Sequence, residues 1–371
     1  MALALKRLQN PVRNRTIPGW AGLASLGASI LVLALVVGVA CWPGDDPAAA
    51  PAAQATPTAA APTGPTGPES YTLADLGVVL AYVRVEPGGV GSLVIALPTG
   101  RTTDIQGARG VFTGVSWAPD GRRLAASFGP SPAVQDIWII DTVAPSVQQL
   151  TKDGQSRRPS WSPDGKAIAY SRSATAERGQ GVVYTMADDG SLAAPLAAAG
   201  TSDDPAWAPD GSAIIASRAP GATVSYSPTT GEELSRVEWL RDSPPTYSSF
   251  DWSPDSSTVA GVVRRGTELA VVIVGDNGTS QRQAGGPFLG HPADPASVHP
   301  TWVTGFDKLI AASDRTGELI LVDLNALPKD MPSDEPYAPV QVLITPPAGT
   351  KLAFPAVRPP PRRGGGGGSV L

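Results

Sequence analysis

RPSWSPDGKAIAYSR, residues 158–172, is the clearest copy of a stretch that recurs along this chain of 371 residues. Related copies begin at Val115, Pro205, Phe250 and Pro300. Each copy has a tryptophan followed, seven residues later, by a branched aliphatic residue. The tryptophans are Trp117, Trp161, Trp207, Trp252 and Trp302, so successive copies lie 44, 46, 45 and 50 residues apart. A nearly constant period in this range indicates a repeat architecture.

Each copy has the pattern of a small antiparallel sheet. A short strand ends on the tryptophan, and Ser/Ala-Pro-Asp follows in four copies, with Gly next in three of them. This sequence favours a tight turn, because Pro fixes φ, Asp bonds its own backbone and Gly accepts positive φ. Apolar runs come next, such as Asp136–Asp141, Gly181–Met186 and Leu269–Val274, bounded by turn residues. Runs of this kind predict strands, and four strands per repeat predict an all-β propeller.

The phase of the repeat gives the number of blades. In-phase aliphatic residues stand at Leu80, Leu124, Ile168, Ile214, Val259 and Leu309, which predicts six blades over residues 71–360. The first unit lacks a Trp strand, and a propeller must close without free sheet edges. Phe354–Pro360 has the pattern of Arg158–Asp164 with Val for Trp, and it is favoured as the closing strand over Tyr71–Gly77.

The pattern W-[SA]-P-D-G-x-x-[IL]-A resembles the TolB-like propeller repeat, which also occurs in the propeller domains of prolyl-oligopeptidase-type enzymes. Four copies match well, whereas the copy at Pro300 has Val-Thr-Gly-Phe in place of the turn. The resemblance covers about residues 71–360 and implies a protein partner in the cell envelope. TolB-like proteins also have an N-terminal α/β domain that is not recognisable here. The fold alone does not fix the activity.

The N-terminal region has the pattern of an export signal. Residues 1–19 contain basic residues and no acid, and residues 20–42 are an uncharged stretch of 23 residues. That length spans a hydrocarbon layer of about 30 Å. The basic flank predicts a cytoplasmic N-terminus and an extracytoplasmic remainder. Three interpretations are open. A signal anchor is the favoured one, a lipoprotein acylated at Cys41 ranks second, and a cleaved signal peptide ranks third. Cys41 is the only cysteine, so the folded part has no disulfide.

Two low-complexity segments flank the repeats. Residues 43–70 consist mainly of Pro, Ala, Thr and Gly and predict a disordered, semi-extended linker. Residues 361–371 contain a run of five glycines and predict a disordered tail.

Candidate catalytic and metal-binding residues are few. The two histidines, His291 and His299, lie in one insertion, Gly285–His299, with Asp294 between them. A metal site is the less favoured interpretation, because no HExxH or other dense ligand pattern accompanies them. The sequence has no G-x-S-x-G elbow, Walker A loop or dinucleotide fingerprint, and the propeller leaves no room for a hydrolase domain. No cofactor and no catalytic residue is therefore predicted.

One aspartate recurs in the turn of each of four copies. The residues are Asp120, Asp164, Asp210 and Asp255. Equivalent turns place them on the same face of the ring, where they could bind a cation or a basic partner together with His291 and His299. The favoured interpretation is that each aspartate caps its own turn.

Charge and composition narrow the function classes. The formal net charge is −5, and the folded part has no basic stripe of the kind that binds nucleic acid. The sequence therefore predicts a non-catalytic protein-binding or scaffold module, tethered outside the cytoplasm of a bacterial cell. A sensor or enzyme that uses the channel mouth for a small ligand or glycan is the alternative. Neither the partner nor the oligomeric state follows from the sequence.

Overall fold

The computed structural model describes residues 70–173, 181–196, 202–218, 222–238, 246–265, 268–275, 281–283, 297–326 and 340–360. The predicted cytoplasmic segment, membrane anchor and glycine-rich tail lie outside these residues, as does the linker up to residue 69. No helix in the described ranges is long and apolar enough to cross a membrane.

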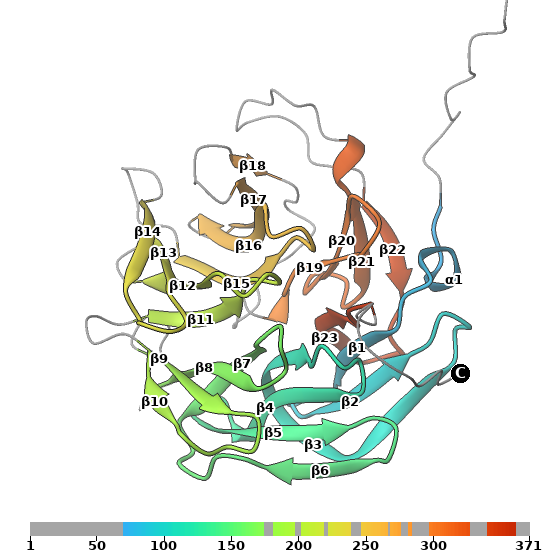
Figure 1. The fold of residues 1–371 in the computed structure, drawn as a ribbon. Coiled ribbons are helices and arrows are strands. Elements are labelled where there is room, and N and C mark those ends of the chain that lie inside the picture. The colour runs from blue at the N-terminus through green and yellow to red at the C-terminus, as the bar shows by residue number, and fades with distance from the viewer. Residues whose placement is uncertain are drawn as a thin grey trace, which may run out of the picture. The chain divides into compact units, whose positions relative to one another are not determined.

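The described chain is almost entirely β-structure, and its strands form sheets arranged around a common centre (Figure 1). Neighbouring strands in the sheets are antiparallel, and one sheet of seven strands has the order β23-β1-β2-β3-β4-β5-β6. Its strands are β23 (Lys351–Val357), β1 (Leu80–Val85), β2 (Gly91–Ala96), β3 (Thr102–Trp117), β4 (Arg123–Ser131), β5 (Val134–Asp141) and β6 (Ser146–Gln149).

Four further sheets have four strands each. The first contains β7 (Ser156–Trp161), β8 (Ala167–Arg172), β9 (Val182–Ala187) and β10 (Ala194–Pro195). The second contains β11 (Ser202–Trp207), β12 (Ile214–Arg218), β13 (Ala222–Tyr226) and β14 (Glu233–Glu238). The third contains β15 (Thr246–Trp252), β16 (Thr258–Arg265), β17 (Glu268–Gly275) and β18 (Gln281–Gln283). The fourth contains β19 (Thr301–Trp302), β20 (Lys308–Ala312), β21 (Leu319–Asp323) and β22 (Val340–Ile344). A 3-10 helix, η3 (Leu324–Ala326), follows β21.

Strand β3 explains the larger sheet. Its first part pairs with β2 up to Gly110, and its second part pairs with β4 from Val111 to Trp117. Four strands per repeat would place the end of one unit and the beginning of the next in two separate strands. In the structure they form one continuous strand of 16 residues, so two four-strand units share it.

The chain ends meet as the sequence predicts. Strand β23 pairs antiparallel with β1, with Val357 opposite Leu80 and Lys351 opposite Val85. The competing segment instead forms a short helix, α1 (Leu73–Leu76). Thr72 and Asp75 form a capping box at its start, and Gly77 ends it with φ of 63°. The C-terminal strand is therefore the one that completes the first unit.

The core lies between the sheets. The inner strands are buried along almost their whole length, as β7 and β11 are, and aromatic rings stack across neighbouring strands in the early units. Phe112 stacks on Phe128, and Phe128 stacks on Trp138, with centroid separations of 4.8 and 4.9 Å. Each unit buries its faces against its neighbours, which is the packing of a repeat array.

Candidate functional site

The inner strands converge on one cavity, which we call the channel. It has a volume of about 350 Å³ and is lined by six segments of the described chain. Five of them contain the tryptophan strand end and the turn that follows it, and the sixth is the end of β23 with the prolines after it. The lining residues thus come from every sheet.

Tryptophan and proline recur at equivalent positions along the channel. Trp117, Trp161, Trp207, Trp252 and Trp302 all line it, with Val357 in the sixth segment. Two residues further on, the rim consists of Pro119, Pro163, Pro209, Pro254, Thr304 and Pro359. The turn sequence thus creates a rigid, largely apolar rim, because proline and packed tryptophan side chains have little conformational freedom to lose.

Hydrogen bonds between successive inner strands run around the channel wall. Where the residue before the tryptophan position has a side-chain oxygen, that oxygen accepts a bond from the backbone amide at the tryptophan position of the next segment. Ser116 Oγ accepts from the Trp161 amide at 3.3 Å, and Ser160 Oγ accepts from the Trp207 amide at 2.9 Å. Thr301 Oγ1 accepts from the Val357 amide at 3.3 Å. Side chains at this position therefore join neighbouring units.

Where alanine takes this position, the backbone carbonyl is the acceptor. Trp252 Nε1 donates to the carbonyl oxygen of Ala206 at 3.2 Å, and Trp117 Nε1 donates to that of Ala356 at 2.9 Å. At these two junctions the indole N–H makes the hydrogen bond between units that involves a side-chain hydroxyl at other junctions. The recurrent tryptophan thus packs the units together and also supplies a donor for joining them.

Asp251 is the acidic residue at this position. Its Oδ2 accepts from the Trp302 amide at 2.9 Å, and its carbonyl oxygen accepts from Trp302 Nε1 at 3.1 Å. Burial raises the pKa of its carboxyl group to about 6, although the amide hydrogen bonds oppose this. Asp251 therefore carries an acid with a raised pKa on the channel wall.

The inner strands carry a second recurrent feature, three residues before the tryptophan position. Non-glycine residues there have positive φ, and the pairing register shifts beside them in four of the strands. The residues are Arg158 (55°), Asp204 (54°), Ser249 (57°), His299 (31°) and Phe354 (51°). Such conformations are unfavourable for residues with a Cβ and need support from surrounding structure.

Four of these residues meet at a smaller cavity of about 30 Å³. Arg158, Asp204, Ser249 and His299 line it, and it shares Val115, Pro159, Pro205, Phe250 and His299 with the channel. The smaller cavity therefore adjoins the channel, and its walls are more polar than the rim of tryptophan and proline.

A buried ion-pair cluster supports this end. Arg158 Nη1 lies 3.0 Å from Asp203 Oδ2, and Arg158 Nε lies 2.6 Å from Asp204 Oδ1. The three side chains are 9%, 1% and 3% exposed. They join β7 to β11, and the partner charges offset the desolvation of each group.

The predicted histidine pair is only partly described. His299 lines both cavities, and its Nδ1 donates to the carbonyl oxygen of Pro355 at 3.1 Å. Burial lowers the pKa of the imidazole, so the neutral form is favoured. His291 and Asp294 lie outside the described residues. Among the described residues, no three His, Cys, Asp or Glu side chains gather in a way that could hold a metal ion.

The four recurrent aspartates each bond their own turn. Asp120 accepts from the amides of Arg122 and Arg123, Asp164 from Ser162 Oγ and the Lys166 amide, Asp210 from the amide and Oγ of Ser212, and Asp255 from Ser253 Oγ and the Ser257 amide. These bonds lower the pKa of all four carboxyl groups, at Asp120 against an opposing effect of burial. The geometry agrees with the turn-capping interpretation.

Sequence reasoning missed Asp251, Arg158, Asp203 and Asp204. A signal for Asp251 was present, since an acid stands where the other copies have Ser116, Ser160, Ala206 and Thr301. No comparable signal marks the Arg158 cluster, because its members come from strands about 45 residues apart.

Comparison with known proteins agrees with this architecture. A family model described as the TolB beta propeller domain matches residues 72–248. The structure of TolB from Acinetobacter baumannii is 18% identical, with a TM-score of 0.58 over 77% of this chain and 68% of that one. A chain of the nidogen/laminin complex is 11% identical, with a TM-score of 0.56 over 76% of this chain and 98% of that one. No curated protein sequence matches significantly. Residues 72–248 thus resemble the TolB beta propeller domain in sequence, and the described chain has an all-β, propeller-like fold.

Proposed function

We propose that this chain is a non-catalytic protein-binding module of the bacterial cell envelope, and that the channel rim is its docking surface. The observation that carries the proposal is the composition of the rim, where tryptophan and proline recur in equivalent turns around a cavity of about 350 Å³. Preorganised aromatic and apolar surfaces surrounded by polar loops favour protein recognition, because little side-chain entropy is lost on binding.

The proposal includes six blades and a membrane tether. The shared strand β3 and the pairing of β23 with β1 support six units of four strands. The uncharged stretch of residues 20–42 supports a signal anchor, with lipidation at Cys41 as the alternative. In this arrangement the propeller lies outside the cytoplasm, and the linker of residues 43–70 holds it away from the membrane.

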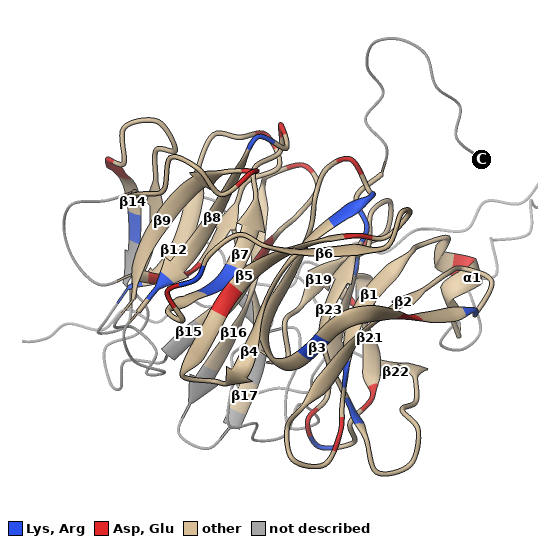
Figure 2. Cartoon of the chain, turned by 90° about the horizontal axis from the view of Figure 1, so that it is seen from below, with Lys and Arg blue, Asp and Glu red and all other residues tan. Residues whose placement is uncertain are grey.

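The electrostatics of the described residues favour a protein over a nucleic acid. Acidic and basic residues are interspersed over the visible strands and loops (Figure 2), and the net charge is −5. A nucleic-acid partner requires a continuous basic surface to bind phosphates.

The full-length protein, cross-linked in native membranes and affinity-purified, tests the proposal. We expect a reproducible envelope protein that is lost when Pro163 and Pro209 on the rim are both replaced by Glu. The matched control replaces Val143 and Leu192, which are exposed away from the channel lining, with Glu. Equal capture by both double variants would contradict docking at the rim.

A small-ligand sensor is the second candidate function, and Asp251 is the observation that favours it. Its carboxyl group has a pKa of about 6 and faces the channel together with His299. If no protein is captured and a glycan raises the melting temperature in a way that requires Asp251, the sensor function replaces the protein-binding one.

A further inference from the structure

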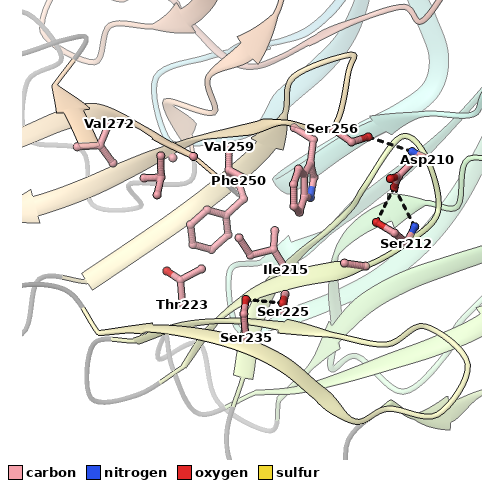
Figure 3. Close-up of a pocket in the computed structure, with 15 residues that line it drawn as sticks. Asp210, Ser212, Ile215, Thr223, Ser225, Ser235, Phe250, Ser256, Val259 and Val272 are labelled. Atoms are coloured by element: carbon pink, nitrogen blue, oxygen red, sulfur yellow. Dashed lines mark hydrogen bonds between the residues drawn. The ribbon is translucent and has the colours of Figure 1, made fainter. Parts of the chain in front are cut away.

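A second cavity lies between two neighbouring sheets and shares Phe250 and Trp252 with the channel lining. It has a volume of about 220 Å³, with the sheet β11–β14 on one side and the sheet β15–β18 on the other (Figure 3). Phe250, Val259 and Val272 form one wall, and Thr223, Ser225 and Ser235 contribute hydroxyl groups from the other. The cavity is thus half apolar and half polar.

The cavity exists because the side chains at this interface are smaller than those at the equivalent positions of the other units. Nine residues after each tryptophan, the second strand of the unit pairs with the third strand through two side chains on the same face. The pairs are Ala126–Trp138, Tyr170–Tyr184, Ala216–Val224, Gly261–Val272 and Ala311–Ile320. Gly261–Val272 is the smallest of the five. A Cβ at Gly261 would lie 3.0 Å from Phe250 Cδ1, so the absent side chain also lets the ring lie against the strand.

The opposite wall departs from the repeat in polarity. Ser225 pairs with Ile215 on this wall, at the position where the other units have Ile139, Thr185, Ile273 and Leu321. Ser225 and Ser235 share a hydrogen bond of 2.7 Å between their hydroxyl groups, and Thr223 lies beside them. The interface between these two sheets therefore has smaller side chains than the other units and also has extra hydroxyl groups. Poor packing alone would explain the smaller side chains but not the hydroxyl groups.

The ionisable residues of the lining indicate whether a charged ligand could bind in this cavity. Asp210 is the one ionisable residue among the described residues of the lining, and its Oδ1 accepts from the Ser212 amide at 2.9 Å and from Ser212 Oγ at 2.7 Å. Since this carboxylate is already bonded and none of the described lining residues is basic, a charged ligand would lose its hydration without gaining a partner among them.

We propose that this cavity binds a small uncharged molecule that has a ring-sized apolar body and a hydroxyl group. The apolar body packs against Phe250 and Val272, and the hydroxyl group bonds to Thr223, Ser225 or Ser235. The cavity volume exceeds the roughly 150 Å³ of an engineered protein cavity that binds benzene, so a substituted ring fits.

Benzyl alcohol is the probe for this proposal, with toluene and benzoate as matched ligands that lack the hydroxyl group or carry a charge. Full-length protein is titrated with each, and binding is followed by ligand-observed NMR. We expect benzyl alcohol to bind with a Kd of about 1 mM, the value typical of a small fragment in a fitting pocket. We expect toluene to bind at least about threefold more weakly, and benzoate not to bind at that concentration.

Two variants locate the binding. Ser225→Ile introduces the residue found at this position in two other units, and Val272→Ile introduces the residue of Ile320. Each fills part of the cavity and should weaken benzyl alcohol binding about tenfold. Thr185→Ile, at the equivalent position of a unit whose residues do not line the cavity, is the control and should bind as the wild type does.

The proposal is overturned if the wild type does not bind benzyl alcohol at about 10 mM, ten times the expected Kd. Equal binding of the three ligands would overturn it as well, because the hydroxyl wall would then have no role. Unchanged binding by a folded Ser225→Ile or Val272→Ile protein would place the ligand elsewhere.

Discussion

Trp117 donates its indole Nε1–H to the carbonyl oxygen of Ala356 at 2.9 Å, across 239 positions of sequence. The bond joins the first complete repeat to the last strand of the propeller. Strand β23 also pairs with β1 through Val357 and Leu80, so the two ends of the folded chain are held by both backbone and side chain.

This closure predicts that a chain ending at Thr350 unfolds without cooperativity. Removing β23 leaves β1 with an unpaired edge and takes Phe354 and Val357 out of the core. Thermal unfolding followed by circular dichroism should show a broad transition. A chain ending at Pro360 keeps the strand and should melt as the full-length protein does. A sharp transition at the same temperature in both chains would contradict the role of β23.

Asp251 predicts a specific pH dependence of stability. Burial raises the pKa of its carboxyl group from 3.8 to about 6, so the folded state binds the proton more tightly than the unfolded state does. Between pH 4 and pH 6 the unfolded state binds fewer protons, and the free energy of unfolding therefore falls as pH rises. The total cost is about 3 kcal/mol above pH 6, at 1.36 kcal/mol per unit of pKa.

The Asp251→Asn variant checks this prediction, because it keeps an acceptor for the Trp302 amide and has no charge to bury. Urea unfolding at pH 4, 5, 6 and 7.5 should show the variant gaining stability relative to the wild type up to pH 6, with a constant difference above. Parallel pH profiles for the two proteins would mean that Asp251 is ionised without cost.

The Arg158 cluster predicts a large effect of a single substitution. Arg158→Met leaves the buried carboxylates of Asp203 and Asp204 without this cation, which should lower the free energy of unfolding by about 3–5 kcal/mol. Arg84→Met is the control, because the Arg84–Asp104 pair is 28% and 45% exposed and should contribute less than about 1 kcal/mol. Similar losses in both variants, measured by urea unfolding at pH 7, would contradict the importance of burial.

Substitutions of a recurrent aspartate can separate its role in capping the turn from the role of its charge. Asp164→Asn keeps an oxygen for the Lys166 amide, so its stability should stay within about 0.5 kcal/mol of the wild type. Asp164→Ala removes the acceptor and should cost about 1 kcal/mol. Partner capture should be equal for the wild type and the Asn variant. A loss of capture with Asn would indicate that the ring of charge itself takes part in binding.

The sequence by itself determined the repeat. The spacing of Trp117, Trp161, Trp207 and Trp252, the Pro-Asp-Gly turns and the pattern at Phe354–Pro360 predict units of four strands and the C-terminal closing strand. These features are local, since turn chemistry and strand alternation depend on residues that are neighbours along the chain. The same locality explains why capping by Asp164 was foreseeable.

Only the tertiary structure decided the chemistry of the cavities. The pKa of Asp251 depends on burial beside Thr301 and Trp302, about 50 residues away. The Arg158–Asp203 contact and the Gly261–Val272 cavity likewise arise where separate units pack against each other. Burial, pairing of charges and unfilled volume are properties of residues that folding brings together, so the repeat pattern alone does not contain them.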